Sequence, residues 1–225
     1  MKRNEAIIPR EELYLYSQVN EADISISGLV TVAASCLPDP EYKGLPIFIV
    51  GPHGGGKSTI AHASLDPELY RLFDTGPILR SYHAQDDPHL KFSGWVSARE
   101  EEYGPAFTDD LLAAHIIGAL ALNRTTPRTP VILGNRSMKG VDRLTSALRA
   151  PSRRLIYITA GETVLYERMQ SREARAIKPK KFAKLLHKDI DTGIGLLEEM
   201  ADYVIRNDGT LEGAVTALRH AVTIA

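Results

Sequence analysis

The chain has 225 residues, of which 44% are hydrophobic, so it is long enough to bury one sizeable core. Its 27 basic and 28 acidic residues give a formal net charge of −1, without the electrostatic footprint of a protein that binds a nucleic acid polymer or an anionic membrane. The single cysteine, Cys36, excludes an internal disulfide framework and fits a cytoplasmic location. We therefore expect a cytoplasmic protein that binds neither a nucleic acid polymer nor a membrane.

The first 45 residues precede the first predicted strand and carry apolar side chains that fit helix and strand periodicities about equally. We expect this N-terminal extension to contribute one or two elements packed on the core. A partner-binding arm through which the chain forms a homodimer is the alternative hypothesis.

A glycine-rich segment, GPHGGGKST at residues 51–59, follows the apolar run at residues 46–50 and matches the whole pattern G-x-x-x-x-G-K-[ST]. Such glycines let successive backbone N–H groups face a phosphate, and the following helix adds partial positive charge. Lys57 would reach the β- and γ-phosphates of ATP, and Ser58 would offer its hydroxyl to Mg²⁺. A glycine-rich turn with a chance lysine is the structural alternative. The predicted ATP-binding residues of this segment are Gly51, Pro52, His53, Gly54, Gly55, Gly56, Lys57, Ser58 and Thr59.

Short apolar runs alternate with helical patterns from residue 46 onward, which is typical of a parallel sheet with crossover helices. Strands are expected at residues 46–50, 70–74, 130–134, 153–159 and 203–206. Helices are expected from Thr59 and Ile60, and over residues 141–149, 162–170, 182–200 and 211–222. Thr108 is the predicted N-cap of a further apolar helix. The fold class that follows is an α/β P-loop NTPase, a three-layer α/β/α sandwich with a five-stranded parallel sheet, over residues 46–225.

Two stretches interrupt this alternation. Residues 81–106 hold Trp95 and many charges between the second and third strands, and we expect a small helical acceptor-binding insertion there. Trp95 and the glutamates at 100–102 could contact an acceptor, although a charged exposed helix explains the glutamates equally well. Residues 171–181 are basic and could close over phosphates as a lid, with a solvated connection as the alternative.

Several segments occur in the order found in nucleoside monophosphate kinases. After the phosphate loop come DTGPILR at 74–80, VILGNR at 131–136, three arginines and ADYVIRNDGT at 201–210. Over about residues 46–222 the chain resembles the cytidylate and adenylate kinase group, with a likeness to dephospho-coenzyme A kinases in the last segment.

The resemblance implies a role for each matching residue. Arg80 would clamp the acceptor phosphate, and Arg136 would help to hold it and act in catalysis. Asp74 would be the base or the Mg²⁺ organiser. Many P-loop enzymes carry an acidic residue that organises Mg²⁺ at the end of the third strand, where this chain has none, and Asp74 is the candidate to replace it. The catalytic lid arginines would be Arg168, Arg172 and Arg175, and the turn with Asn207 and Gly209 would lie beneath the adenine.

Each of these roles has a structural competitor. Asp74 could cap a turn with Gly76, and the arginines could be surface residues in ordinary ion pairs.

The sequence therefore predicts an ATP- and Mg²⁺-dependent phosphotransferase whose acceptor is a small molecule, foremost a nucleoside monophosphate. A small-metabolite kinase, in which Asp74 deprotonates an alcohol and Arg80 binds a carboxylate, is the alternative within enzymes. A nucleotide-dependent switch or binding protein is the alternative of another class.

Overall fold

The computed structural model describes residues 40–122, 127–172 and 177–223. The predictions for residues 1–39 lie outside this part of the chain. The described residues divide into two compact units. The sheet unit comprises Leu45–Leu72, Thr129–Val141 and the described residues from Ser152 onward, and the helical unit comprises those within Phe73–Arg128 and Asp142–Pro151 together with residues 40–44.

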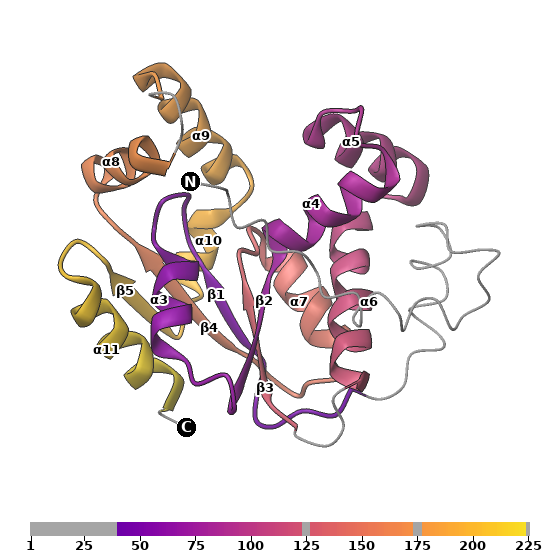
Figure 1. Cartoon of the computed structure of the whole chain (residues 1–225), viewed down its shortest axis with the longest axis horizontal. Coiled ribbons are helices and arrows are strands. Elements are labelled where there is room, and N and C mark those ends of the chain that lie inside the picture. Colours follow the sequence, from indigo (N-terminus) through magenta and orange to yellow (C-terminus); the bar gives the residue numbers. More distant parts are fainter. Residues whose placement is uncertain (1–39, 123–126, 173–176, 224–225) are drawn as a thin grey trace. The chain divides into compact units, whose positions relative to one another are not determined.

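A five-stranded parallel sheet forms the centre of the fold, in the order β2-β3-β1-β4-β5 (Figure 1). Its strands are β1 at Ile47–Val50, β2 at Tyr70–Asp74, β3 at Thr129–Leu133, β4 at Arg154–Thr159 and β5 at Tyr203–Arg206. β1 lies in the middle and is buried along its whole length, as expected for a short continuous apolar run. The prediction of five parallel strands is confirmed.

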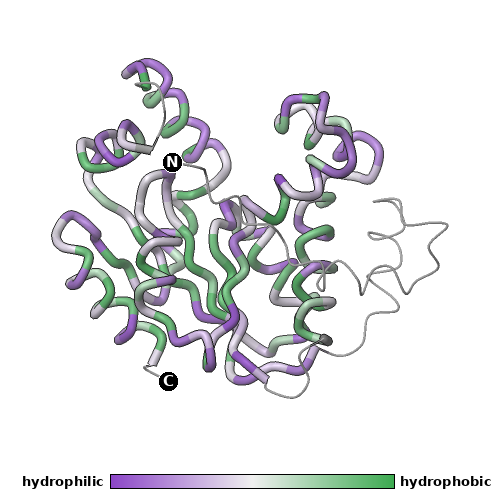
Figure 2. Tube along the Cα trace, viewed as in Figure 1, coloured by the Kyte–Doolittle hydropathy of each residue, from purple (hydrophilic) through white to green (hydrophobic). Residues whose placement is uncertain are grey.

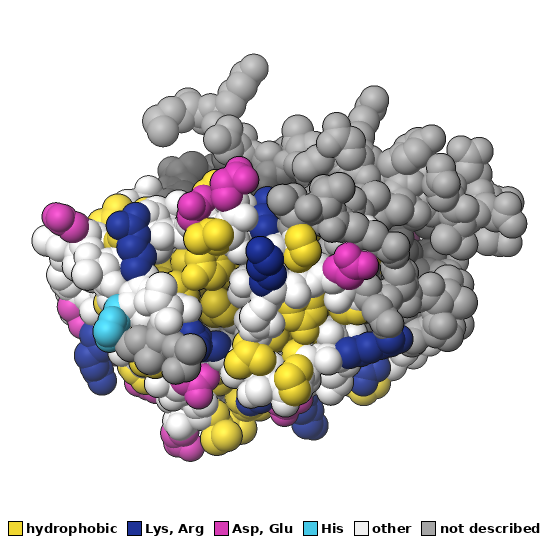
Figure 3. All heavy atoms as spheres, turned by 90° about the horizontal axis from the view of Figure 1, so that it is seen from below, with side chains coloured by type: hydrophobic (Ala, Val, Ile, Leu, Met, Phe, Trp, Pro, Cys, Tyr) yellow, Lys and Arg dark blue, Asp and Glu magenta, His cyan; other side chains and the backbone are white. Residues whose placement is uncertain are grey.

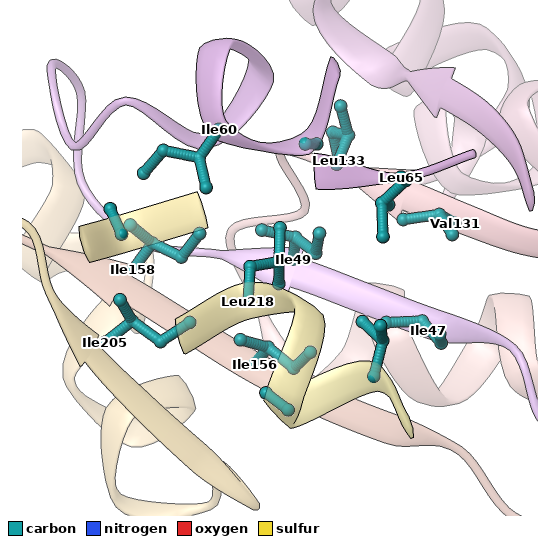
Figure 4. Packing of buried hydrophobic residues seen from close by; sticks show 14 residues of the cluster. Ile47, Ile49, Ile60, Leu65, Val131, Leu133, Ile156, Ile158, Ile205 and Leu218 are labelled. Atoms are coloured by element: carbon teal, nitrogen blue, oxygen red, sulfur yellow. The ribbon is translucent and has the colours of Figure 1, made fainter. Parts of the chain in front are cut away.

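Helices α3, at Lys57–Ser64, and α11, at Leu211–Thr223, pack on one face of the sheet. Ile47 and Ile49 of β1 and Leu218 of α11 belong to the core cluster there, and Figure 4 shows these side chains directed toward one another. Side chains at alternate positions of a strand share a face, which is why Ile156 and Ile158 of β4 join the same cluster.

Tyr157 lies between those two isoleucines and therefore faces the other side of the sheet. Burial raises the pKa of Tyr157 to about 12, and the negative charges of Glu198 and Asp189 add to the effect. These carboxylates belong to α10, at Ile194–Glu199, and α9, at Pro179–Asp191, so helices cover this face as well. The predicted three-layer arrangement is confirmed.

The single helix expected over residues 182–200 is wrong, because α9 ends at Asp191 and α10 begins at Ile194. Gly193 separates them with a φ of 90°, a left-handed conformation that ends a helix and that glycine adopts without strain. The other helix of this unit is α8, at Glu162–Arg172, and α7, at Met138–Ala147, crosses the boundary between the units.

The helical unit contains α4 at Thr75–Asp86, α5 at Phe92–Tyr103 and α6 at Phe107–Leu122. Residues 81–106 are thus largely helical despite their weak periodicity. Thr108 is not the N-cap of α6, because the helix already includes Phe107, which is fully buried against the rings of Trp95 and Tyr103. Figure 2 shows α6 as largely hydrophobic and α5 as largely hydrophilic.

Trp95 is 0% exposed, and its Nε1 donates to Asp86 Oδ2 at 2.6 Å. The hypothesis that Trp95 contacts the acceptor is therefore wrong for this structure, since the indole is a core side chain of the helical unit. Glu102 is exposed and paired with Arg99, as the charged-helix alternative expected.

Charged side chains of both signs lie among hydrophobic ones on the face drawn in Figure 3, in keeping with the nearly balanced composition. Within the described residues, no helix has the length and apolar character needed to cross a membrane.

Candidate active site

The glycine-rich loop joins the carboxyl end of β1 to the amino end of α3. Gly51 has a φ of 135°, and a Cβ built on it would lie 2.1 Å from the carbonyl oxygen of Ile158 in β4. Gly56, the N-cap of α3, has a φ of 91°, and its Cβ would lie 2.6 Å from Asn207 Nδ2. Both positions favour glycine because L side chains rarely adopt such positive φ values, and because a Cβ would collide with β4 at Gly51 and with the side chain of Asn207 at Gly56. α3 begins at Lys57, two positions before the expected start, so its first N–H groups belong to the loop.

The ammonium group of Lys57 lies at one end of the loop, beside its first residues. Its Nζ donates to the carbonyl oxygens of Gly51 and Pro52, both at 2.8 Å. The ammonium group thus lies over the first residues of the loop. Since the lysine of this motif reaches the β- and γ-phosphates, the terminal phosphates of a bound nucleotide belong at this end.

A cavity of about 280 Å³ lies at the other end of the loop. It is lined by Gly56, Thr59, Ile60, Arg168, Ser171, Asn207 and Leu211. Arg168 Nη2 donates to the carbonyl oxygen of Asn207 at 2.8 Å, and Asn207 Nδ2 donates to that of Gly55 at 2.9 Å. Among the residues that the structure describes, the buried Nη1 of Arg168 has no hydrogen-bond partner. A cavity that combines the apolar side chains of Ile60 and Leu211 with polar ones suits a flat ligand group that carries hydrogen-bonding atoms.

An ion-pair network lies at the Lys57 end of the loop. The carboxylate of Asp189 accepts at Oδ2 from the backbone N–H of His53, at 3.0 Å, and from its Nδ1, at 2.9 Å. Its Oδ1 accepts from Arg136 Nη1 at 2.9 Å, and Arg136 Nη2 donates to His53 Nε2. This pattern requires a neutral His53 with the proton on Nδ1. The network joins the loop, the segment after β3 and α9.

The side chain of Asp189 is only 2% exposed, which alone would raise its pKa. The hydrogen bonds from the ring and backbone of His53, together with the charge of Arg136, outweigh burial and hold the pKa of Asp189 below its ordinary value. Asp189 is therefore an anion at neutral pH, and the cost of burying that charge is offset by its partners.

Sequence reasoning did not single out Asp189, although a signal for it exists. Phe182 and Asp189 are the buried residues of α9 and lie seven positions apart, on one face of the helix. Leu185 and Leu186 of the same face pack against Phe182 and its neighbours. A carboxylate at a position where helical spacing expects an apolar residue indicates a buried partner.

Asp74 and Arg80 lie in the helical unit. Asp74 is the N-cap of α4, and its Oδ1 accepts from the backbone N–H of Gly76 at 3.3 Å, which is the turn that the structural alternative expected. Arg80 is exposed, and its guanidinium would lie 3.3 Å from a Cβ on Gly76. The start of α4 thus brings this carboxylate, this glycine and this arginine together.

The remaining predicted residues are placed as follows. Gly209 is exposed in the turn between β5 and α11 and is not among the residues that line the cavity. Arg175 and the side chain of Arg172 lie outside the described residues. The lid roles given to them, and the catalytic role given to Arg168, stay predictions.

No protein-family model and no curated protein matches the sequence. Solved structures do match. Shikimate kinase from Bacteroides thetaiotaomicron gives a TM-score of 0.52 at 12% identity, covering 80% of this chain and 99% of that chain. Shikimate kinase from Acinetobacter baumannii in complex with shikimate gives 0.51 at 17% identity, covering 80% and 94%. A protein from Thermus thermophilus gives 0.51 at 18% identity, covering 79% and 95%. The chain has the fold of the P-loop kinases, as its sequence predicted.

Proposed function

We propose that this protein is an ATP-dependent kinase that phosphorylates a hydroxyl group of a small molecule. The observation that carries the proposal is the loop with two distinct ends, a cation at Lys57 and a cavity at Arg168. This arrangement suits a nucleoside triphosphate whose base and terminal phosphates need different surroundings.

The donor would lie along the loop of the sheet unit. Its base would enter the cavity, whose lining offers the apolar side chains of Ile60 and Leu211 and the polar side chains of Arg168 and Asn207. Its phosphates would accept from the loop N–H groups and from Lys57. Ser58, which follows Lys57 in α3, is a hard oxygen donor that fits Mg²⁺, an ion that takes most of its other ligands from phosphates and water. Mg²⁺ would neutralise charge on the phosphates.

The acceptor would be a hydroxyl compound with an acidic group. Asp74 supplies a carboxylate that can take the hydroxyl proton, and Arg80 supplies an exposed guanidinium fork that fits a carboxylate. In the reaction the hydroxyl oxygen forms a bond to the γ-phosphorus, and the bond between that phosphorus and the β–γ bridging oxygen breaks. The products are the phosphate ester, ADP and one proton.

Two of the similar solved structures are kinases named for shikimate rather than for a nucleotide. They support a small-molecule acceptor, which was the alternative in the sequence analysis, better than the nucleoside monophosphate that was its main expectation. Nothing among these neighbours supports a nucleotide acceptor specifically.

The test is the production of ADP from Mg·ATP by the purified protein, with and without candidate acceptors. Hydroxy acids, sugar acids and sugars form one panel, and ribo- and deoxynucleoside monophosphates form the other. We expect a member of the first panel to stimulate ADP production by the wild-type protein, and no acceptor to stimulate it in Lys57→Ala. Lys184→Ala, which changes an exposed lysine of α9, serves as the matched control. Stimulation by a monophosphate alone would restore the nucleotide kinase. Tight ATP binding without stimulation by any acceptor would favour a switch or binding protein.

A further inference from the structure

In the network of His53, Arg136 and Asp189, the buried carboxylate of Asp189 bonds both of the other residues. Its Oδ2 accepts from His53 of the loop and its Oδ1 accepts from Arg136 Nη1, so the carboxylate sets the position of the guanidinium relative to the loop. The side chain of Arg136 is 40% exposed, which leaves part of it open to a ligand, whereas that of Asp189 is 2% exposed and closed to one.

The position of His53 shows at which end of the loop the network lies. His53 directly follows Pro52, whose carbonyl oxygen accepts from Lys57 Nζ. The cavity at the other end is lined by Gly56, Thr59 and Asn207. Arg136, in contact with His53, therefore lies at the end that we assign to the terminal phosphates.

We propose that Asp189 is a positioning residue that holds Arg136 where it can bind the γ-phosphoryl group of ATP. The proposal rests on the assignment of the loop to ATP and deepens it. A guanidinium fixed in this way needs no reorganisation when negative charge shifts in the transferring group, which is the condition for effective electrostatic stabilisation. Asp189 itself touches neither the donor nor the acceptor.

The role requires a carboxylate and not merely a polar side chain of that size. An asparagine at 189 has one acceptor oxygen, and the loop offers two N–H donors from His53 to it. Its amide NH₂ would then face Arg136 Nη1, donor against donor, and that bond would be lost. Asp189→Asn thus removes the contact that holds Arg136 Nη1 while keeping the loop contact and almost the same volume.

The experiment compares binding of ATP and of ADP, both with Mg²⁺, by calorimetry in the full chain, with no acceptor present. The variants are Asp189→Asn, Arg136→Ala and the double variant. We expect each single variant to weaken ATP binding by roughly tenfold, the size of one lost charge-assisted hydrogen bond, and ADP binding by less than twofold. The double variant should bind ATP no more weakly than Arg136→Ala alone.

The matched control is Asp191→Asn, the same chemical change at an exposed position of the same helix, and it should leave both affinities unchanged. Equal losses of ATP and ADP affinity in Asp189→Asn, or losses that multiply in the double variant, would show a merely structural role and overturn the proposal. Should Asp189→Asn not fold, Arg136→Lys, which lacks the fork needed to reach Asp189 and His53 together, decides in the same way.

This experiment separates the two proposals. The binding readout does not depend on turnover, so a protein that discriminates ATP from ADP through Arg136 and Asp189 but phosphorylates no acceptor would count against the kinase alone. A wild-type protein with acceptor-stimulated turnover and no ATP-specific loss in Asp189→Asn would count against Asp189 alone.

Discussion

Arg80 is the residue for which the sequence and the structure make the most direct functional prediction. It is exposed on α4, beside Gly76, and it is not among the residues that line the cavity. Arg80→Ala should raise the KM for the acceptor by on the order of tenfold or more and leave ATP affinity within about twofold, because only the acceptor contact is lost. Steady-state kinetics at saturating Mg·ATP measures the first quantity and calorimetry the second. Arg206→Ala, on an exposed position of β5, is the control, and a large loss of ATP binding would reject the acceptor role of Arg80.

Gly51 shows how a single residue type is fixed by packing. Gly51→Ala combines a backbone conformation that L side chains rarely adopt with a Cβ placed 2.1 Å from the carbonyl oxygen of Ile158. We expect the free energy of unfolding to fall by about 3 kcal/mol or more, as measured by urea denaturation.

Gly94 provides the opposite case for the same substitution. It lies inside α5, and among the described residues nothing beyond its chain neighbours and the backbone of its own helix comes within 4 Å of a Cβ built on it. Gly94→Ala should therefore raise the free energy of unfolding by about 0.5–1 kcal/mol. A fall in both variants, or in neither, would contradict the distinction between strained and permissive glycines.

At the scale of elements, Trp95 holds the helical unit together. Its ring packs against Phe92 of α5 and Phe107 of α6, and its Nε1 bonds Asp86 of α4. Trp95→Ala should therefore lower the free energy of unfolding by about 3–5 kcal/mol, and Trp95→Phe should lower it less. Denaturation followed by far-UV circular dichroism tests both. Unchanged stability together with a raised KM for the acceptor would instead indicate that Trp95 contacts the acceptor, as its sequence context suggested.

The element boundaries show what local sequence patterns do and do not contain. All five strands lie within one residue of their predicted bounds at each end, because their apolar runs are short and flanked by glycine, proline or charged residues. The break at Gly193 was missed because α9 and α10 both carry leucines at helical spacing, and one glycine interrupts such a pattern without erasing it.

At the scale of the whole molecule, nucleotide binding should couple to unfolding. Mg·ATP at one hundred times its Kd should add about 2.7 kcal/mol to the free energy of unfolding, and for a chain of this length it should raise Tm by roughly 5–10 °C. Thermal unfolding followed by circular dichroism, with and without Mg·ATP, measures this shift. Lys57→Ala should lose most of the shift without loss of its own Tm in the absence of nucleotide, and a full shift in that variant would refute the assignment of Lys57.

The sequence by itself determined the phosphate loop, the parallel sheet and the P-loop fold, because a contiguous motif and contiguous apolar runs encode them. It also identified Lys57, Arg136 and Asn207 as candidate site residues, since each lies just after a predicted strand or within the phosphate-loop motif. Only the tertiary structure decided which residues meet. His53 and Asp189 are 136 positions apart, and Arg136 and Asp189 are 53 apart, so their network depends on how α9 packs against the loop. The burial of Trp95 and the cavity beside Arg168 likewise arise from packing between distant segments, which no local pattern records.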